Sequence, residues 1–175
     1  MDKKSDAASN NVLISIYQEY AEAILCGEKI IEFRKAQFPS SISRVYLYST
    51  SPIKKVVGCF EVEVVLKTSP TYLWNRYGKS GSIGREDFLR YYGDSDEACG
   101  ILVKSVIRFS RPVDLKDIDS SMTAPQSFCY LNASMVGKLE SRAFSTSWFG
   151  NLSKFFPVLR QVRKIPNVFK AAGLS

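Results

Sequence analysis

The sequence predicts an α+β fold: a small mixed β-barrel with two or three flanking helices and a basic C-terminal extension. Three observations support this prediction. Segments rich in β-branched and aromatic residues dominate the chain, and the strongest of them runs from Val56 to Leu66. Two or three amphipathic segments lie between them, without the regular alternation of strand and helix found in parallel α/β proteins. The length of 175 residues is typical of one domain.

The positive charge of the chain belongs mainly to its C-terminal part. The formal net charge is +7, and residues 142–175 hold six basic residues and no acidic one, which leaves +1 for residues 1–141. We therefore expect a disordered lead-in at residues 1–11, a domain at residues 12–141 and a basic aromatic extension at residues 142–175.

The extension has two interpretations. Pro157 and Pro166 exclude one continuous helix. Its aromatic residues either pack on the barrel while the basic residues face water, or the extension contacts phosphate through spaced cations and stacking rings. Under the second interpretation the phosphate-contacting residues are Lys79 from the domain and Arg160, Arg163 and Lys164 from the extension.

Composition excludes several classes of function. The chain has no histidine, so Ser-His-Asp and Cys-His nucleophile systems, histidine zinc sites and imidazole general bases are impossible within it. The four cysteines are widely separated, which argues against a zinc or redox motif, and we predict no metal site and no cofactor. No apolar run approaches the ~20 residues of a membrane span, and residues 1–6 lack a hydrophobic signal segment. We expect a cytoplasmic protein with no membrane partner.

The first elements expected are a strand at residues 12–16 and a helix directly behind it. Ser15 and Gln18 have the spacing of a capping box, and apolar residues recur at helical spacing as far as Leu25. Gly27 then stands where a helix would end.

A charged strand is expected after this glycine. If the strand is regular from Ile30, Glu32 and Arg34 point to the same side, because alternate residues of a strand share a face. Lys29 has the opposite parity and joins them only if it still belongs to the turn. The residues alone favour an ordinary ion pair on a half-buried strand.

Three further strands are expected, at residues 44–48, 56–66 and 98–109. Gly58 marks a bulge in the second, and Pro112 is expected to close the third. The apolar face of the second strand is expected to comprise Phe60, Val62, Val64 and Leu66.

Two helices are expected between the second and third of these strands. Ser69 and Pro70 begin one, as cap and first helical residue, and residues 83–92 form the other. Between them, Gly-Lys-Ser-Gly at residues 78–81 is similar to the end of a phosphate-binding loop. The required earlier glycine is missing, because Leu73 stands in its place. We interpret these residues as a flexible basic loop.

A helix followed by Gly-x-Lys-x-x-Glu-x-Arg at residues 27–34 resembles the signature of the ASCH domain, a member of the PUA-like group of small β-barrels. The resemblance continues through residues 48–52, 57–62 and 88–93. Residues 125–131 resemble the end of the domain in some relatives. The resemblance thus covers most of the chain, and the order of the segments carries more weight than the short octapeptide.

The resemblance implies a cleft that faces RNA or a nucleoside-like ligand. Lys29 and Arg34 would hold a phosphate or a base edge, and Glu32 would accept from an exocyclic amine or orient Arg34. A tyrosine would stack on an unpaired base. A module that binds a modified nucleobase would use the same cleft, and the sequence does not separate it from RNA binding. The other residues predicted to line the cleft are Tyr46, Tyr48, Thr50 and Ser127.

The resemblance also leaves an amidohydrolase open as an alternative. Some relatives act on acetylated cytidine and resemble this chain at Lys29 and Arg34. They have a threonine where this chain has Glu32. Their further catalytic glutamate would fall at residues 80–82, where this chain has Ser-Gly-Ser.

A ribonuclease is the second enzymatic alternative, since other relatives are metal-dependent ribonucleases. Mg²⁺ or Mn²⁺ would then be held by Glu32 with Glu61 or Glu63. We rank RNA binding first and leave open whether the chain is an enzyme. The candidates for catalysis are Lys29 and Glu32.

Overall fold

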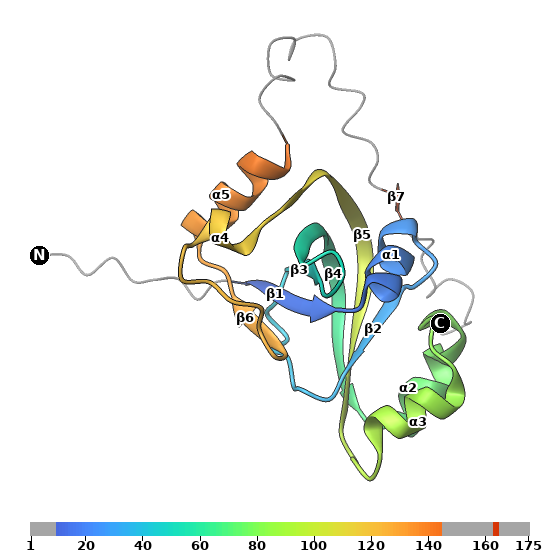
Figure 1. The fold of residues 1–175 in the computed structure, drawn as a ribbon. Helices are drawn as coiled ribbons and strands as arrows, with labels where there is room; N and C mark the ends of the chain where they lie inside the picture. The colour runs from blue at the N-terminus through green and yellow to red at the C-terminus, as the bar shows by residue number, and fades with distance from the viewer. Residues whose placement is uncertain (1–9, 145–162, 165–175) are drawn as a thin grey trace, which may run out of the picture.

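The structure is a computed structural model that describes residues 10–144 and the backbone of residues 163–164. One curled sheet has the strand order β2-β5-β4-β3-β1-β6, and the short strand β7 pairs with β5 (Figure 1). The α+β class and the barrel-like sheet are confirmed. The strands are β1 (Asn11–Ile16), β2 (Ile31–Arg34), β3 (Arg44–Ser49), β4 (Lys55–Thr68), β5 (Ala98–Val113), β6 (Phe128–Tyr130) and β7 (Arg163–Lys164). The helices are α1 (Gln18–Cys26), α2 (Pro70–Tyr77), α3 (Arg85–Tyr92), α4 (Leu115–Ile118) and α5 (Ala133–Ala143), with a 3₁₀ turn η1 (Gly78–Ser80).

The described residues contain more α-helices than the two or three expected, because α4 and α5 were missed. These two helices lie at the opposite end of the sheet from α2 and α3 (Figure 1). The side chain of Asn132 caps α5 by accepting a hydrogen bond from the backbone N–H of Met135. None of the helices in this part of the chain has the length and apolar character needed to cross a bilayer.

The expected domain boundaries stay predictions. Helix α5 runs to Ala143 and so spans the expected boundary after residue 141. Strand β1 begins at Asn11, which is the last residue of the expected lead-in, and residues 1–9 lie outside the described residues.

Strands β1 and β3 are parallel neighbours, whereas the other paired strands of the sheet are antiparallel. Parallel strands end at the same edge of a sheet, so Ser15 lies beside Tyr48, and the next residues, Ile16 and Ser49, are also paired. Strand β6 pairs with the other side of β1, and its register brings the preceding Ser127 to the level of Ser15. The ends of β1 and β3 therefore gather residues from three parts of the chain.

The long antiparallel pair of β4 and β5 curls the sheet. Its register shifts at Gly58, which confirms the predicted bulge, and shifts again between Glu61 and Val64. Each shift changes the face that the following residues occupy. The prediction that the apolar residues from Phe60 to Leu66 share one face is therefore wrong. Phe60 packs inside the curl, whereas Val64 and Leu66 pack under α2 and α3.

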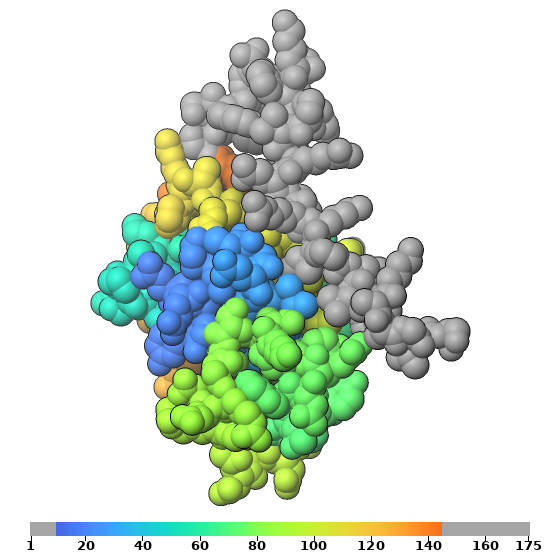
Figure 2. All heavy atoms as spheres, turned by 90° about the vertical axis from the view of Figure 1, so that its right-hand side faces the viewer, coloured from blue at the N-terminus to red at the C-terminus, as the bar shows by residue number. Residues whose placement is uncertain are grey.

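Three apolar clusters pack against the sheet. The first fills the curl beneath α1 and includes Ile24, the second lies under α4 and α5 and includes Leu115, and the third lies under α2 and α3 and includes Phe88. Strand β5 runs to Val113, past the proline expected to close it, and its last residue packs in the second cluster. In Figure 2 the surface of α1 (blue) adjoins that of residues 70–92 (green) on one face of the molecule.

Helix α1 begins without the predicted capping box. Its N-cap is Tyr17, and no side chain caps the helix. The capping box is wrong because Ser15 still belongs to β1, where its hydroxyl donates to the Pro125 carbonyl at 2.6 Å. The predicted helix end at Gly27 is confirmed, since this glycine has a φ of +84° and its N–H donates to carbonyls of the last turn.

Residues 78–81 do not form the free basic loop that was expected. The turn η1 packs its backbone against the start of the charged strand. The Ser80 carbonyl accepts from the N–H of Ile30, and the Gly81 carbonyl accepts from the side chain of Lys29. The Gly-Lys-Ser-Gly segment is thus part of the support of the octapeptide.

Candidate functional site

Lys29, Glu32 and Arg34 form one buried ion cluster. Lys29 Nζ lies 3.5 Å from Glu32 Oε2, and Arg34 Nε lies 2.9 Å from Glu32 Oε1. The three side chains are 3%, 7% and 11% exposed, so the charges lie just beneath the surface. Glu32 and Arg34 share a face, as their parity predicts. Lys29 joins them because it belongs to the turn, where its backbone N–H donates to the Ala23 carbonyl of α1.

The ammonium group of Lys29 is fully engaged inside the protein. It donates to the Gly81 carbonyl and lies 5.2 Å from the ring centroids of both Tyr20 and Phe33. Burial lowers the pKa of Lys29, and the carboxylate of Glu32 opposes that shift. Lys29 is therefore an internal cation that connects the carboxylate of Glu32 to the Gly81 carbonyl, directly after η1.

The guanidinium of Arg34 reaches across to the end of β1, where a terminal nitrogen donates to the Ser15 carbonyl at 2.8 Å. Its Nε is close to Glu32, but the N–H is not aligned with the carboxylate and has no hydrogen-bond partner among the described residues. The charge of Arg34 is therefore paired while one of its donors is unsatisfied.

Two hydroxyls at the same strand ends also lack hydrogen-bond partners among the described residues, namely Ser49 Oγ and Thr50 Oγ1. Ser49 is 1% exposed and pairs in register with Ile16, and Thr50 donates its backbone N–H to the Ile16 carbonyl. An unsatisfied buried polar group costs about 1–3 kcal/mol and is uncommon in folded proteins. We call Arg34, Ser49 and Thr50 the strand-end site.

The other residues predicted to line the cleft divide into two groups. Tyr48 is 8% exposed and Ser127 is partly exposed, and the register of the strands places both level with Ser15. Tyr46 is wholly buried, and its hydroxyl donates to Glu140 at 2.8 Å. Burial raises the pKa of Tyr46. Tyr46 therefore offers no surface to a ligand.

The residues predicted to contact phosphate lie in different places. Lys79 is exposed on η1. Arg163 and Lys164 form β7, whose backbone pairs with Val106 and Ser105 of β5. Arg160 lies outside the described residues.

Sequence reasoning missed Ser49, Gly81 and Lys54. Ser49 begins a run of three hydroxyl residues at the end of an apolar strand, and that run was the available signal. A Cβ at Gly81 would lie 2.1 Å from the Phe33 ring, so only glycine fits there. Lys54 is exposed, has a φ of +54° and donates its backbone N–H to the Thr50 carbonyl, which no local pattern indicates.

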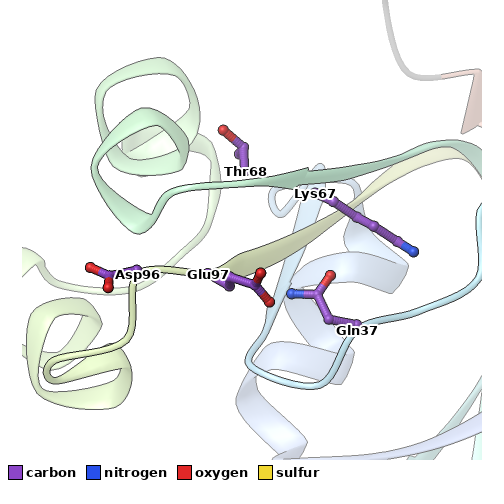
Figure 3. Close-up of a pocket in the computed structure, with 5 residues that line it drawn as sticks. All are labelled: Gln37, Lys67, Thr68, Asp96 and Glu97. Atoms are coloured by element: carbon purple, nitrogen blue, oxygen red, sulfur yellow. The ribbon is translucent and has the colours of Figure 1, made fainter.

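Two surface hollows lie away from the ion cluster, and neither is lined by residues 27–34. In Figure 3, Gln37 and Glu97 of the first hollow point toward one another, while Asp96 and Thr68 point away. In the second hollow, ion pairs already join the side chains, so its charges neutralise one another. The first, of about 340 Å³, is lined by Gln37, Lys67, Thr68, Asp96 and Glu97, and the second, of about 410 Å³, by Asn11, Ser43, Arg44, Glu61, Val62, Lys104, Val136 and Glu140.

Of the three carboxylates named for a divalent metal, Glu32 and Glu61 are engaged with other groups of the chain, and Glu63 is exposed. Glu32 lies between Lys29 and Arg34, and Glu61 accepts from the Ser105 hydroxyl at 3.0 Å. Residues 10–144 contain no group of three or more histidine, cysteine, aspartate or glutamate side chains placed to hold a metal ion. The expectation that the protein uses no cofactor stays a prediction.

Comparison with known proteins identifies relatives that match about three quarters of this chain. A protein named ASCH domain-containing ribonuclease, from Zymomonas mobilis, is 30% identical over 133 residues, which cover 74% of this chain and 89% of the relative. The crystal structure of ASCH from Zymomonas mobilis matches with a TM-score of 0.70 at 30% identity, over 75% of this chain and 94% of that chain.

Two variants of that protein have also been solved. The crystal structure of a tyrosine-to-phenylalanine variant matches with a TM-score of 0.70 at 29% identity, over 75% of this chain and 97% of that chain. The crystal structure of a serine-to-alanine variant matches with a TM-score of 0.73 at 28% identity, over 77% of this chain and 97% of that chain. The family model of the ASCH domain matches residues 14–109, which include the ion cluster and the strand-end site. This chain therefore belongs to the ASCH domain family.

Proposed function

We propose that this protein binds RNA, or a modified nucleobase within RNA, at the strand-end site. The observation that carries the proposal is that Arg34, Ser49 and Thr50 each have a polar side-chain atom without a hydrogen-bond partner among the described residues. Arg34 bonds to Ser15 at the end of β1, and Ser49 and Thr50 lie beside the next residue, Ile16. Membership of the ASCH family supports RNA as the class of ligand, because a relative of 30% identity is named as a ribonuclease.

The chemistry of the site suits the edge of a base or the oxygens of a phosphodiester. A hydroxyl both donates and accepts hydrogen bonds, and an arginine N–H donates in a fixed direction. The ion cluster has a formal charge of +1, from two cations and one anion, so electrostatic attraction at the site is modest. The hydrogen bonds made at Ser49, Thr50 and Arg34 would then provide most of the discrimination between ligands.

Lys29 and Glu32 act as positioning residues in this proposal. Glu32 orients the guanidinium of Arg34, and Lys29 holds Glu32 while bonding to the Gly81 carbonyl. Thr50 is itself partly exposed, so rotation of its side chain would turn the hydroxyl toward solvent.

The substitution Thr50→Val tests the proposal, because valine keeps the shape of threonine and removes the unpartnered hydroxyl. We expect the thermal midpoint to stay unchanged or to rise, since the free protein gives up no hydrogen bond. RNA affinity should fall by about 5- to 10-fold, the reduction expected for one hydrogen bond. Fluorescence anisotropy with a labelled oligonucleotide and thermal unfolding measure the two quantities.

Thr68→Val is the matched control, because Thr68 is also a partly exposed threonine at a strand end and lies outside the site. It should bind RNA as the parent protein does. Equal RNA affinity of Thr50→Val and the parent would remove the strand-end site from the proposal.

RNA cleavage is a second candidate, favoured by the name of the relative and by the serine and tyrosine variants solved for it. This chain brings Tyr48 and Ser127 to the same level across β3, β1 and β6. Because the chain has no histidine, proton transfer must use hydroxyls, carboxylates or lysine.

Incubation of the protein with single-stranded RNA, with and without a chelator, tests this second candidate. Tyr48→Phe should abolish product formation, whereas Tyr130→Phe, an exposed tyrosine on β6, should leave it unchanged. If the parent protein yields no product with or without added Mn²⁺, binding alone remains as the function.

A further inference from the structure

Aromatic contacts place two exposed tyrosines on either side of the ion cluster. On α1, the ring centroids of Tyr17 and Tyr20 lie 6.3 Å apart, and Lys29 Nζ lies 5.2 Å from the ring of Tyr20. On α3, the rings of Tyr91 and Tyr92 lie 5.0 Å apart, and the Tyr92 hydroxyl donates to the last carbonyl of β2. The ion cluster thus lies between an aromatic pair on α1 and another on α3.

In each pair one ring faces solvent. Tyr17 is 68% exposed and Tyr91 is 39% exposed, whereas Tyr92 is 2% exposed. Lys35 follows the ion cluster in sequence, and its Nζ lies 5.5 Å from the centroid of the Tyr91 ring. The backbone N–H of Lys35 donates to the Tyr91 hydroxyl, which holds that ring beside β2. Exposed rings next to cations are the combination that single-stranded nucleic acids require.

We propose that Tyr17 and Tyr91 are stacking platforms, on the two sides of Arg34, for unpaired bases of the bound RNA. This inference rests on the proposed function, whose ligand it narrows. The surface of α1 adjoins that of residues 70–92, which include α3, on the face shown in Figure 2, so one RNA strand can run from α1 to α3. Unpaired bases offer their faces to aromatic rings, whereas those of a duplex are covered by stacking.

The charged residues near the two rings indicate where the phosphates of the RNA would lie. Glu19 lies in the first turn of α1, and Asp87 of α3 is paired with Arg90. Both carboxylates raise the pKa of Tyr20, after the larger effect of burial. Phosphates are therefore expected to follow the exposed Lys35, with the bases turned toward the rings.

Substitution of Tyr17 tests the inference without disturbing the fold, because this side chain is exposed and makes no cap hydrogen bond. Tyr17→Leu should weaken the binding of a single-stranded oligouridylate by about 5- to 10-fold, the lower range for removal of one stacked base. Tyr17→Phe keeps the ring and should bind as the parent does. Tyr72→Leu, which changes a 53% exposed tyrosine on α2, is the matched control and should also bind as the parent does.

The same pair of substitutions applies to the other ring. Tyr91→Leu should weaken binding to a similar extent, and Tyr91→Phe should retain most of the affinity. Since Tyr91 is partly packed, the thermal midpoint of each variant is measured alongside its affinity.

An oligonucleotide with abasic sites separates stacking from phosphate contacts, because it keeps the phosphates and lacks the base faces. It should bind the parent more weakly than oligouridylate does, and Tyr17→Leu should not weaken the binding of this ligand further. A duplex of the same length should bind more weakly than the single strand and should not respond to Tyr17→Leu.

Failure of this inference differs from failure of the proposed function. If Tyr17→Leu and Tyr91→Leu bind the single strand as the parent does while Thr50→Val binds it weakly, the inference alone is overturned. If duplex RNA binds as tightly as the single strand and is weakened as much by Tyr17→Leu, the ring contacts something other than an unpaired base, and the inference is again overturned. If the parent binds no RNA at all, both proposals fail.

Discussion

At the scale of single residues, the carboxylate of Glu32 offsets the positive charges of the ion cluster. It is the one anion of the ion cluster, and it contacts both Lys29 and Arg34. Without its carboxylate, two buried cations would face each other in a medium of low polarity. The pKa of Lys29 is lowered by burial, and Glu32 acts to keep that lysine charged.

Replacement of Glu32 by Gln should therefore destabilise the protein strongly. We expect Glu32→Gln to lower the free energy of unfolding by about 3–5 kcal/mol, the usual cost of breaking a buried ion pair. Glu28→Gln, an exposed glutamate four residues earlier, should change it by no more than roughly 0.5 kcal/mol. Urea denaturation measures both. Equal stability of the two variants would show that the ion cluster does not depend on the carboxylate charge.

The thiol of Cys59 makes the stability of the protein depend on pH in the alkaline range. Burial raises the pKa of this thiol from 9.0 to about 12. Between these two values the unfolded chain loses the thiol proton while the folded protein keeps it, so the contribution of Cys59 is full below pH 9.0 and is lost as pH rises. Lys29 has the opposite effect. Because its pKa is lowered in the folded protein, its contribution to stability rises as the pH increases toward the ordinary lysine pKa of 10.5.

The stability of Cys59→Ala should accordingly fall less steeply with pH than that of the parent protein. Between about pH 9 and pH 11 the difference in slope should approach about 1.4 kcal/mol per pH unit, the value for one proton. Cys26→Ala, which changes an exposed thiol, should alter the slope much less. Denaturant unfolding at a series of pH values measures the slopes, and parallel curves for Cys59→Ala and the parent would contradict the assignment.

At the scale of elements, η1 supports the octapeptide through backbone carbonyls, and this contact depends on Gly81. A Cβ at this position would meet the ring of Phe33 at 2.1 Å, so the ring, η1 or β2 must move. Such a movement would also displace the carbonyl that accepts from Lys29.

Gly81→Ala should therefore lower the free energy of unfolding by about 1–3 kcal/mol, as overpacking usually does. Gly137→Ala is an informative control, because a Cβ there meets nothing within 4 Å and the residue lies inside α5. It should raise stability by about 0.5–1 kcal/mol. Thermal or denaturant unfolding of both variants checks the pair, and a Gly81→Ala variant as stable as the parent would show that η1 adapts without cost.

Local sequence patterns predicted correctly those features of the helices and strands that depend on residues close together in the sequence. The end of α1 at Gly27 and the shared face of Glu32 and Arg34 follow from helix termination and strand alternation alone. The faces of β4 after Glu61 did not follow, because a bulge depends on the partner strand as much as on the strand itself. Helix α5 was missed because only one side of it packs, with Leu139 and Ala143 as its buried residues.

At the scale of the whole molecule, the charge that attracts RNA and the site that recognises it lie, under our proposal, in different parts of the sequence. Residues 1–141 carry a formal charge of +1, and most of the remaining charge follows residue 144. Affinity driven by phosphate contacts should therefore depend on the extension, whereas selectivity should depend on the strand-end site.

Neutralising the extension in the full-length chain tests this division. We expect simultaneous replacement of its basic residues by glutamine to make the logarithm of RNA affinity depend less steeply on the logarithm of salt concentration. For a single strand, the slope should decrease by about 0.7 for every phosphate that the extension no longer binds. An unchanged slope would mean that the extension does not bind phosphate. Arg142 lies in α5 and is kept. The residues to replace are the other five, Lys154, Arg160, Arg163, Lys164 and Lys170.

The amino-acid sequence by itself determined the fold class, the end of the first helix and the shared face of Glu32 and Arg34. Through the absence of histidine, it also determined which classes of catalysis are closed to this chain. Only the tertiary structure decided that Lys29 is an internal cation and that Ser49 and Thr50 lack partners among the described residues. The physical reason is that burial and hydrogen-bond satisfaction depend on groups far away in sequence. The Gly81 carbonyl is 52 residues from Lys29, and the parallel pairing of β1 with β3 brings Ser49 and Thr50 beside Ile16, the residue after the one that Arg34 contacts.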